Sequence, residues 1–114
     1  MRVFVPEIPR RIDVSGAKKF GKIIPIFDEQ ERRESIFHCE KFGLDVIRRL
    51  DELEFDHESD YLCVSGKQLL TILVVLAAAT RYSQVRLLVF DAARDEYVCR
   101  EINLEKWGVN GNVN

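Results

Sequence analysis

The stretch that decides the fold is DYLCVSGKQLLTILVVLAAATRYSQVRLLVFDAARDEYVCREI, which occupies residues 60–102. It begins with a short apolar strand, 61–64, and continues after Ser65-Gly66-Lys67 into eleven almost entirely apolar residues, 69–79. A second apolar strand follows at 85–91. Because two parallel strands need a crossover connection and a helix of this length supplies one, the pattern predicts a βαβ unit.

Two further strands and an amphipathic helix are predicted upstream of this unit. Residues 2–5 and 22–28 have the composition of strands, and Pro25 cannot donate a backbone hydrogen bond, so the second strand should lie at a sheet edge or carry a bulge. Between 36 and 53, apolar residues recur with the helical period opposite a charged stripe. This pattern predicts a half-buried amphipathic helix.

A short helix is predicted over residues 13–21, between the first two strands. Asp13 or Ser15 can accept hydrogen bonds from the free N–H groups at its start, and Gly21 suits the position after its last turn. Near the other end of the chain, residues 92–95 can turn the last parallel strand back on itself.

Together these elements predict a small single-domain α/β protein with a mostly parallel sheet, βαβ units and a C-terminal antiparallel hairpin. The returning strand of the hairpin is predicted at 96–102. We assign residues 1–102 to the domain and residues 103–114 to a C-terminal tail that is rich in glycine and asparagine near its end. The order of the strands does not follow from the pattern.

Length, charge and cysteine content narrow the classes of function. The chain has 114 residues with 46% hydrophobic and 32% charged residues, enough for one core without disulfide staples. With 17 basic and 19 acidic residues, neither a nucleic-acid nor a membrane partner is expected on electrostatic grounds. Three scattered cysteines, no signal-peptide pattern before Pro6 and no run long enough to span a bilayer predict a cytoplasmic protein with free thiols.

The carboxyl ends of the parallel strands are where open α/β sheets bind ligands. The helix that follows the third strand begins with free N–H groups and a positive dipole end, which favour an anion, and Lys67 adds a positive charge. Gly66 would let a ligand approach the backbone. The sequence therefore offers a candidate anion or nucleotide site made of Ser65, Gly66, Lys67, Asp28 and Asp91.

Structural roles account for the same residues. Ser65 can be a plain N-cap and Gly66 a tight turn, since the junction lacks the glycine spacing and the hydroxyl of a phosphate-binding loop. An aspartate at a strand end often caps the next turn. His38 and His57 belong to no nucleophile–base pair and no metal-ligand spacing, so we expect both on the solvated surface and expect no catalytic residue, metal or cofactor. A metal-dependent hydrolase that uses the two strand-end aspartates is the weakest alternative.

The central helix is hydrophobic nearly all round. Between residues 69 and 79 only Thr71 is polar, whereas a helix that packs on a sheet needs only one apolar stripe. Its outer face must be covered by the amphipathic helix, by the tail around Trp107, or by another chain. The sequence leaves all three covers open.

The region 60–102 resembles a group of short α/β proteins of unknown function that recur in bacteriophage and bacterial genomes. The resemblance extends loosely to the short helix at 13–20 and Gly21, and many members have Trp at the position of Phe90. It implies the scaffold and a phage or mobile-element setting, and no activity comes with it. The residues that carry it are Asp60-Tyr61, Ser65-Gly66, the alanine-rich end of the helix, Val85-Arg86-Leu87-Leu88, Asp91 and Tyr97.

Two functions from different classes are expected. The first is a non-enzymatic binding protein, a phage or mobile-element accessory factor that contacts another protein or forms a homo-oligomer, because catalytic motifs are missing and the central helix is unusually apolar. The second is a protein that binds or sequesters a nucleotide or a cyclic oligonucleotide at the junction of strand and helix around residues 65–67.

Overall fold

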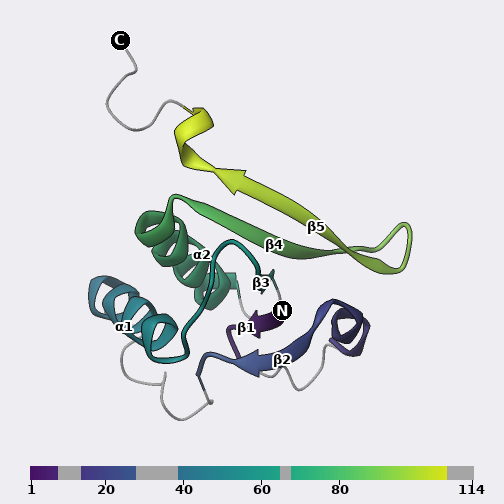
Figure 1. The fold of residues 1–114 in the computed structure, drawn as a ribbon, viewed down its shortest axis with the longest axis horizontal. Helices are drawn as coiled ribbons and strands as arrows, with labels where there is room; N and C mark the ends of the chain where they lie inside the picture. Colours follow the sequence, from purple (N-terminus) through teal and green to yellow (C-terminus); the bar gives the residue numbers. More distant parts are fainter. Residues whose placement is uncertain (8–13, 28–38, 65–67, 108–114) are drawn as a thin grey trace.

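The sheet is the centre of the fold. The computed structural model describes residues 1–7, 14–27, 39–64 and 68–107, and within these ranges five strands form one sheet in the order β2-β1-β3-β4-β5 (Figure 1). The mixed α/β class and the mostly parallel sheet are therefore confirmed. Four strands run parallel and the fifth pairs antiparallel with β4; they are β1 (Arg2–Val5), β2 (Lys22–Pro25), β3 (Tyr61–Val64), β4 (Gln84–Asp91) and β5 (Glu96–Asn103).

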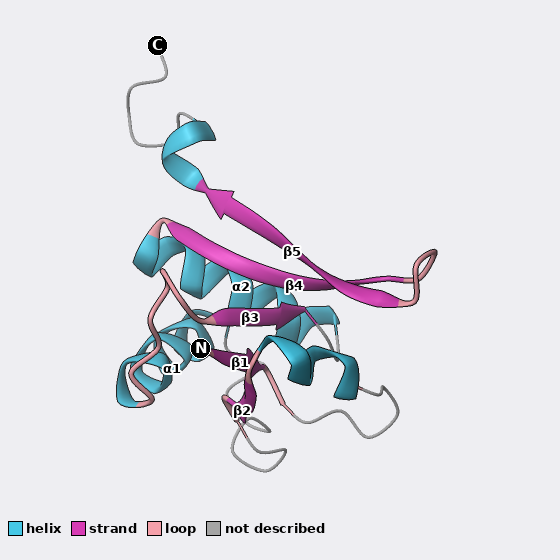
Figure 2. Cartoon of the chain, turned by 45° about the vertical axis from the view of Figure 1, so that its right-hand side comes forward, coloured by secondary structure: helices cyan, strands magenta, loops and turns pink. Residues whose placement is uncertain are grey.

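Each face of the sheet has its own apolar core, because successive side chains of a strand point to opposite faces. Helices α1 (Cys39–Glu52) and α2 (Gln68–Tyr82) pack on one face, and the 3₁₀ helix η1 (Ser15–Phe20) packs on the other (Figure 2). The first core joins Phe4, Leu62 and Val85 of the sheet to Phe42, Val46 and Leu50 of α1 and to Leu70, Val74 and Ala78 of α2. The second core consists of Val3, Val5, Ala17, Tyr61, Cys63, Leu88 and Tyr97.

The placement of the helices follows from the strand order. The chain steps from β1 to β2 in one direction across the sheet, then from β2 to β3 and on to β4 in the other. Right-handed crossovers in opposite directions place their connecting helices on opposite faces of a sheet. This is the arrangement observed, with η1 on one face and α1 and α2 on the other. The direction reverses between β1 and β3, which are neighbours.

The edge position of β2 agrees with the presence of Pro25. β2 is an end strand of the described sheet, so the missing N–H of Pro25 breaks no ladder on its outer side. The strand ends at Pro25, earlier than predicted, but Ile26 N–H still donates to Val5 O at 2.8 Å. Phe27 N–H likewise donates to Pro6 O at 3.1 Å. The chain therefore stays beside β1 beyond the strand, and Asp28 lies outside the described residues.

The short helix predicted at 13–21 is a 3₁₀ helix that begins at Ser15 and ends at Phe20. Val14 is its N-cap and makes no side-chain cap hydrogen bond. Ser15 is the first residue of the helix, and Asp13 lies outside the described residues. Gly21 follows the helix with φ 153°, a conformation that favours glycine. A Cβ at this position would lie 2.6 Å from Met1 O, so glycine is needed for the close approach of the chain to the start of β1.

The C-terminal segment continues past the sheet. A further 3₁₀ helix, η3 (Leu104–Trp107), follows β5, and Leu104 N–H donates to Ser83 O at 2.8 Å. The Leu104 side chain packs against the core beneath the two α-helices. The division into a domain at 1–102 and a tail at 103–114 stays a prediction.

Candidate functional site

Asp91 is the predicted site residue whose contacts can be described, and it caps a turn. Its Oδ1 accepts a hydrogen bond from Ala93 N–H at 3.1 Å, and its Oδ2 lies 3.7 Å from Arg94 Nε. Val89 pairs with Val64 at the end of β3, so Asp91 lies beyond the end of that strand, on the hairpin that projects past the other strands (Figure 1). These contacts are those of a strand-end aspartate that stabilises the next turn.

The remaining predicted site residues, Asp28, Ser65, Gly66 and Lys67, lie outside the described residues. The neighbouring geometry can nevertheless be described, because β1 and β3 pair and the strand order reverses between them. The crevice outside the carboxyl ends of two such strands is the usual ligand position in open α/β sheets. β3 ends at Val64, at this crevice.

Glu7 also lies at the carboxyl ends of the strands, and it was not predicted as a site residue. It follows β1 by two positions and its exposed fraction is 8%. In the sequence it stands between two prolines in a stretch that predicts only a loop, so no signal distinguished it from other surface glutamates. Glu7 therefore brings a carboxylate to the carboxyl end of β1.

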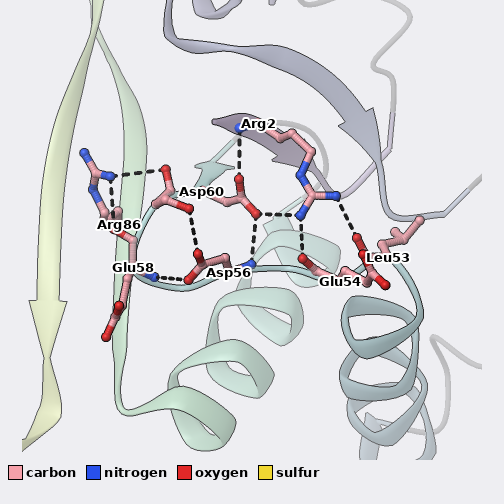
Figure 3. Close-up of polar contacts among 8 residues, drawn as sticks. Arg2, Leu53, Glu54, Asp56, Glu58, Asp60 and Arg86 are labelled. Carbon is pink, nitrogen blue, oxygen red and sulfur yellow. Dashed lines mark hydrogen bonds and ion pairs between the residues drawn. The ribbon is translucent and has the colours of Figure 1, made fainter.

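A dense polar network around Asp60 lies at the amino ends of β1 and β3, opposite the carboxyl ends described above (Figure 3). Asp60 is 2% exposed and directly precedes β3. Its Oδ1 accepts from Arg2 N–H at 2.9 Å, while its Oδ2 accepts from Arg2 Nη2 at 2.8 Å and from Asp56 N–H at 2.9 Å. The Arg2 guanidinium also donates to Leu53 O at 2.7 Å and to Glu54 O. Both carboxylate oxygens are therefore engaged, and the cluster ties β1 to the α1–β3 turn.

The α1–β3 turn is fixed from within by Asp56. Its carboxylate accepts from Glu58 N–H at 3.0 Å and from the Ser59 hydroxyl at 2.9 Å. These two hydrogen bonds hold the pKa of Asp56 below its ordinary value. The carboxylate is thus engaged in holding the turn.

Arg86 of β4 closes the network from the other side (Figure 3). Its guanidinium lies 4.3 Å from the centroid of the Tyr61 ring and donates to the Tyr61 hydroxyl at 2.8 Å. It also donates to Glu58 O at 3.3 Å and to Ser59 O at 3.2 Å. Arg86 therefore joins β4 to β3 and to the turn, which is a structural role.

His57 is more enclosed than predicted. Its ring stacks on Tyr82 with 5.4 Å between centroids, and its Nδ1 is buried with no hydrogen-bond partner among the described residues. The Tyr82 hydroxyl donates to Asp51 Oδ1 at 3.3 Å, and burial together with the Asp51 carboxylate raises the pKa of Tyr82. The expectation of a solvated surface histidine was wrong for His57, while His38 lies outside the described residues.

The outer face of α2 remains exposed. Leu69, Ile72 and Leu76 are 47%, 54% and 58% exposed, and their spacing of three and four residues aligns them along one face of the helix. Helix α1 packs beside α2 without covering them, and Trp107 is itself 64% exposed. We call these three residues the α2 stripe. Among the described residues, neither α1 nor Trp107 covers the α2 stripe.

The described residues hold no arrangement typical of a metal centre. No group of three or more His, Cys, Asp or Glu residues in the described ranges could hold a metal ion. The three cysteines are free: Cys39 is exposed, Cys99 is half-buried and Cys63 is buried. Among the described helices, none is both long and apolar enough to cross a membrane.

The strand order, with two α-helices on one face of the sheet and a 3₁₀ helix on the other, defines a small, mostly parallel α/β protein. In the described residues, the side chains of the polar network around Asp60 are held by hydrogen bonds within the chain. The sequence model of the Phage Pam3 gp32-like protein family matches residues 1–104, and the chain belongs to this family. The resemblance to phage proteins is thereby confirmed. Neither the curated proteins nor the solved structures gave a match.

Proposed function

We propose that this chain is a non-enzymatic phage accessory protein that acts by binding another protein molecule through the α2 stripe. The observation that carries the proposal is the exposure of Leu69, Ile72 and Leu76 in one line on a helix that is otherwise a core element. Contiguous exposed apolar surface marks an interaction site on a soluble domain. The phage setting comes from the family, and the free cysteines fit action in the reducing cytoplasm of the host.

The two ends of the sheet are less suited to docking than the stripe. On β5, the Arg100 guanidinium donates to Cys99 O at 2.9 Å and so competes for a backbone acceptor that an added strand would need. The neighbouring Glu101 adds a charge to the same strand. On β2, Pro25 has no N–H to offer. The α2 stripe has neither a charge nor a proline, because all its side chains are aliphatic.

Photo-crosslinking in phage-infected cells tests the proposal. A photoreactive residue is placed at position 72 and, as a matched control, at position 44, because Leu44 is 69% exposed on α1. We expect a protein adduct from position 72 and not from position 44. The adduct should disappear when Leu76→Asp is added and should survive Leu44→Asp.

The protein identified in the adduct is then purified and titrated against this chain. The parent should bind it, and Ile72→Asp should weaken the Kd at least about tenfold, which corresponds to ~1.4 kcal/mol. Equal adducts at positions 72 and 44, or binding that ignores Ile72→Asp, would contradict the role of the stripe. Circular dichroism of each variant checks that the fold is retained.

A nucleotide or cyclic-oligonucleotide binding protein is a second candidate, favoured by one observation. The strand order reverses between β1 and β3, so the carboxyl end of β3 lies where such folds bind ligands, and Ser65-Gly66-Lys67 follow this strand in the sequence. A thermal-shift screen tests it, because a ligand at 100 times its dissociation constant adds about 2.7 kcal/mol of stability. Lys67→Ala should remove the shift without lowering the stability of the free protein. Absence of a shift with mono-, di- and cyclic nucleotides would reject this candidate.

A further inference from the structure

We propose that the outer edge of β5 pairs with β5 of a second copy of this chain, antiparallel and centred on Val98. The contact is separate from the α2 stripe and goes beyond the proposed function. β5 is an end strand of the described sheet, so one side of its backbone faces away from β4 (Figure 1).

The hydrogen bonds to β4 indicate which backbone groups of β5 face outward. Leu104 N–H donates to Ser83 O at 2.8 Å, directly beyond the pair of Gln84 with Asn103. Because hydrogen-bonded and non-hydrogen-bonded positions alternate along an antiparallel pair, the odd-numbered residues of β5 direct their N–H and C=O groups outward. The position of Cys99 O agrees, because the side chain of Arg100 reaches it at 2.9 Å.

The side chains of β5 specify both the partner and the register. Glu96 and Arg100 lie two residues on either side of Val98, on the same face of the sheet. When Val98 faces Val98 of a second copy, each Glu96 faces Arg100 of the other chain, and two ion pairs form about the two-fold axis. Within the described residues, neither Glu96 nor Arg100 has an ion-pair partner in its own chain. Centring the pair on Arg100 or on Glu101 would instead set two like charges opposite each other.

The bond from Arg100 to Cys99 O selects against strands of other sequence. A foreign strand must displace the guanidinium from this carbonyl, which is why the β5 edge is less suited to docking in general. A second copy instead supplies the Glu96 carboxylate to receive the guanidinium, and Cys99 O becomes available to a backbone N–H. The seam is short, so we expect a weak pair with a dissociation constant on the order of 1 mM.

Disulfide trapping tests the pairing and its centre. The background carries Cys39→Ser and Cys99→Ser, while Cys63 stays because it is buried. Val98→Cys should form a dimer disulfide, because facing residues at a non-hydrogen-bonded position have Cα atoms about 4.5 Å apart, within the range of a disulfide. Glu101→Cys is the matched control, since it is exposed on the same strand but its two copies would lie roughly 20 Å apart in this register. We expect Val98→Cys to be trapped at least about tenfold faster, and equal rates overturn the inference.

Exchange of the two charges tests the ion pairs. In the Val98→Cys chain, Glu96→Arg alone and Arg100→Glu alone should each slow trapping at least about fivefold, because like charges then face each other. The double variant should recover the original rate to within about twofold, because opposite charges face each other again. This recovery also shows that a slow single variant has not merely lost its fold. A double variant as slow as either single variant overturns the charge-matched register.

Ile72→Asp separates this contact from the α2 stripe. It should leave the trapping rate of Val98→Cys unchanged, because position 72 lies on α2 and not on β5. A rate that Ile72→Asp lowers would assign the contact to the α2 stripe and overturn the inference. The proposed function fails separately, when position 72 gives no protein adduct in infected cells.

Discussion

At the scale of the residue, Asp60 shows how one buried carboxylate joins segments far apart in the chain. It holds the first strand by two hydrogen bonds from Arg2 and holds the α1–β3 turn by one from Asp56 N–H. Two of these three donors are backbone groups, one at the start of β1 and one in the α1–β3 turn. Asp60 and its neighbour Tyr61 are also among the residues that carry the resemblance to phage proteins, and their contacts give that pair a structural role.

Asp60→Asn should therefore destabilise the protein by about 2 kcal/mol, since it removes a charge-assisted bond to a part-buried guanidinium and leaves one acceptor short. Urea unfolding at pH 7 measures this as a lower midpoint. Glu52→Gln is the control, because Glu52 pairs with Arg48 and Arg49 on the exposed side of α1, where such pairs contribute little. Similar midpoints for the two variants would contradict the structural role of Asp60.

Asp56 predicts a dependence of stability on pH. Its pKa in the folded protein is lowered from 3.8 by hydrogen bonds from Glu58 N–H and the Ser59 hydroxyl. A lowered pKa means that the stabilisation is present above the unfolded value and is lost as pH falls through the folded value. The stability difference between the parent and Asp56→Asn, measured by urea unfolding, should therefore be present at pH 7 and shrink below about pH 4. A difference that is constant from pH 7 to pH 3 would refute this assignment.

At the scale of the element, sequence patterns predicted what depends on local chemistry. The four residues of β1, the edge position of β2 and the buried face of α1 follow from a β-branched and aromatic composition, from Pro25 and from the helical period. The details of η1 did not follow, because its end is set by contact with another segment. Gly21 is required there by the backbone of Met1, which no pattern within the short helix reveals.

Gly21→Ala tests this contact, with Gly43→Ala as a matched control. At Gly21 a methyl group would meet Met1 O at 2.6 Å and the φ of 153° is unfavourable for alanine, so the variant should lose roughly 2 kcal/mol. At Gly43, inside α1, a methyl group meets nothing within 4 Å, and alanine should add about 0.5–1 kcal/mol through its helix propensity. Thermal unfolding should thus shift in opposite directions. A shift in the same direction would contradict this account.

At the scale of the whole molecule, candidate sites depend on how the elements meet. The sequence pointed to the carboxyl ends of the strands, and Asp91, which is described, is engaged in a turn. The sequence also indicated that α2 is more apolar than a helix needs to be when only one of its faces packs on a sheet. Which of its side chains stay exposed is decided by where α1 packs. The positions Leu69, Ile72 and Leu76 could be selected only once α1 was placed, since Leu70 and Val74 on the same helix are fully buried.

A homo-oligomer, which the sequence analysis names as one form of the binding function, predicts that thermal stability depends on protein concentration if it forms through the α2 stripe. Unfolding would then release two chains from each dimer, so raising the concentration favours the folded state by mass action. Where the dimer is populated, a hundredfold increase should add about 1.4 kcal/mol per chain, which corresponds to roughly 6 °C for a domain of this size. Ile72→Asp should unfold at one temperature across the same range, because its stripe cannot pair without burying a carboxylate. A parent protein whose midpoint ignores concentration from 5 to about 500 μM would argue that the α2 stripe serves a different protein.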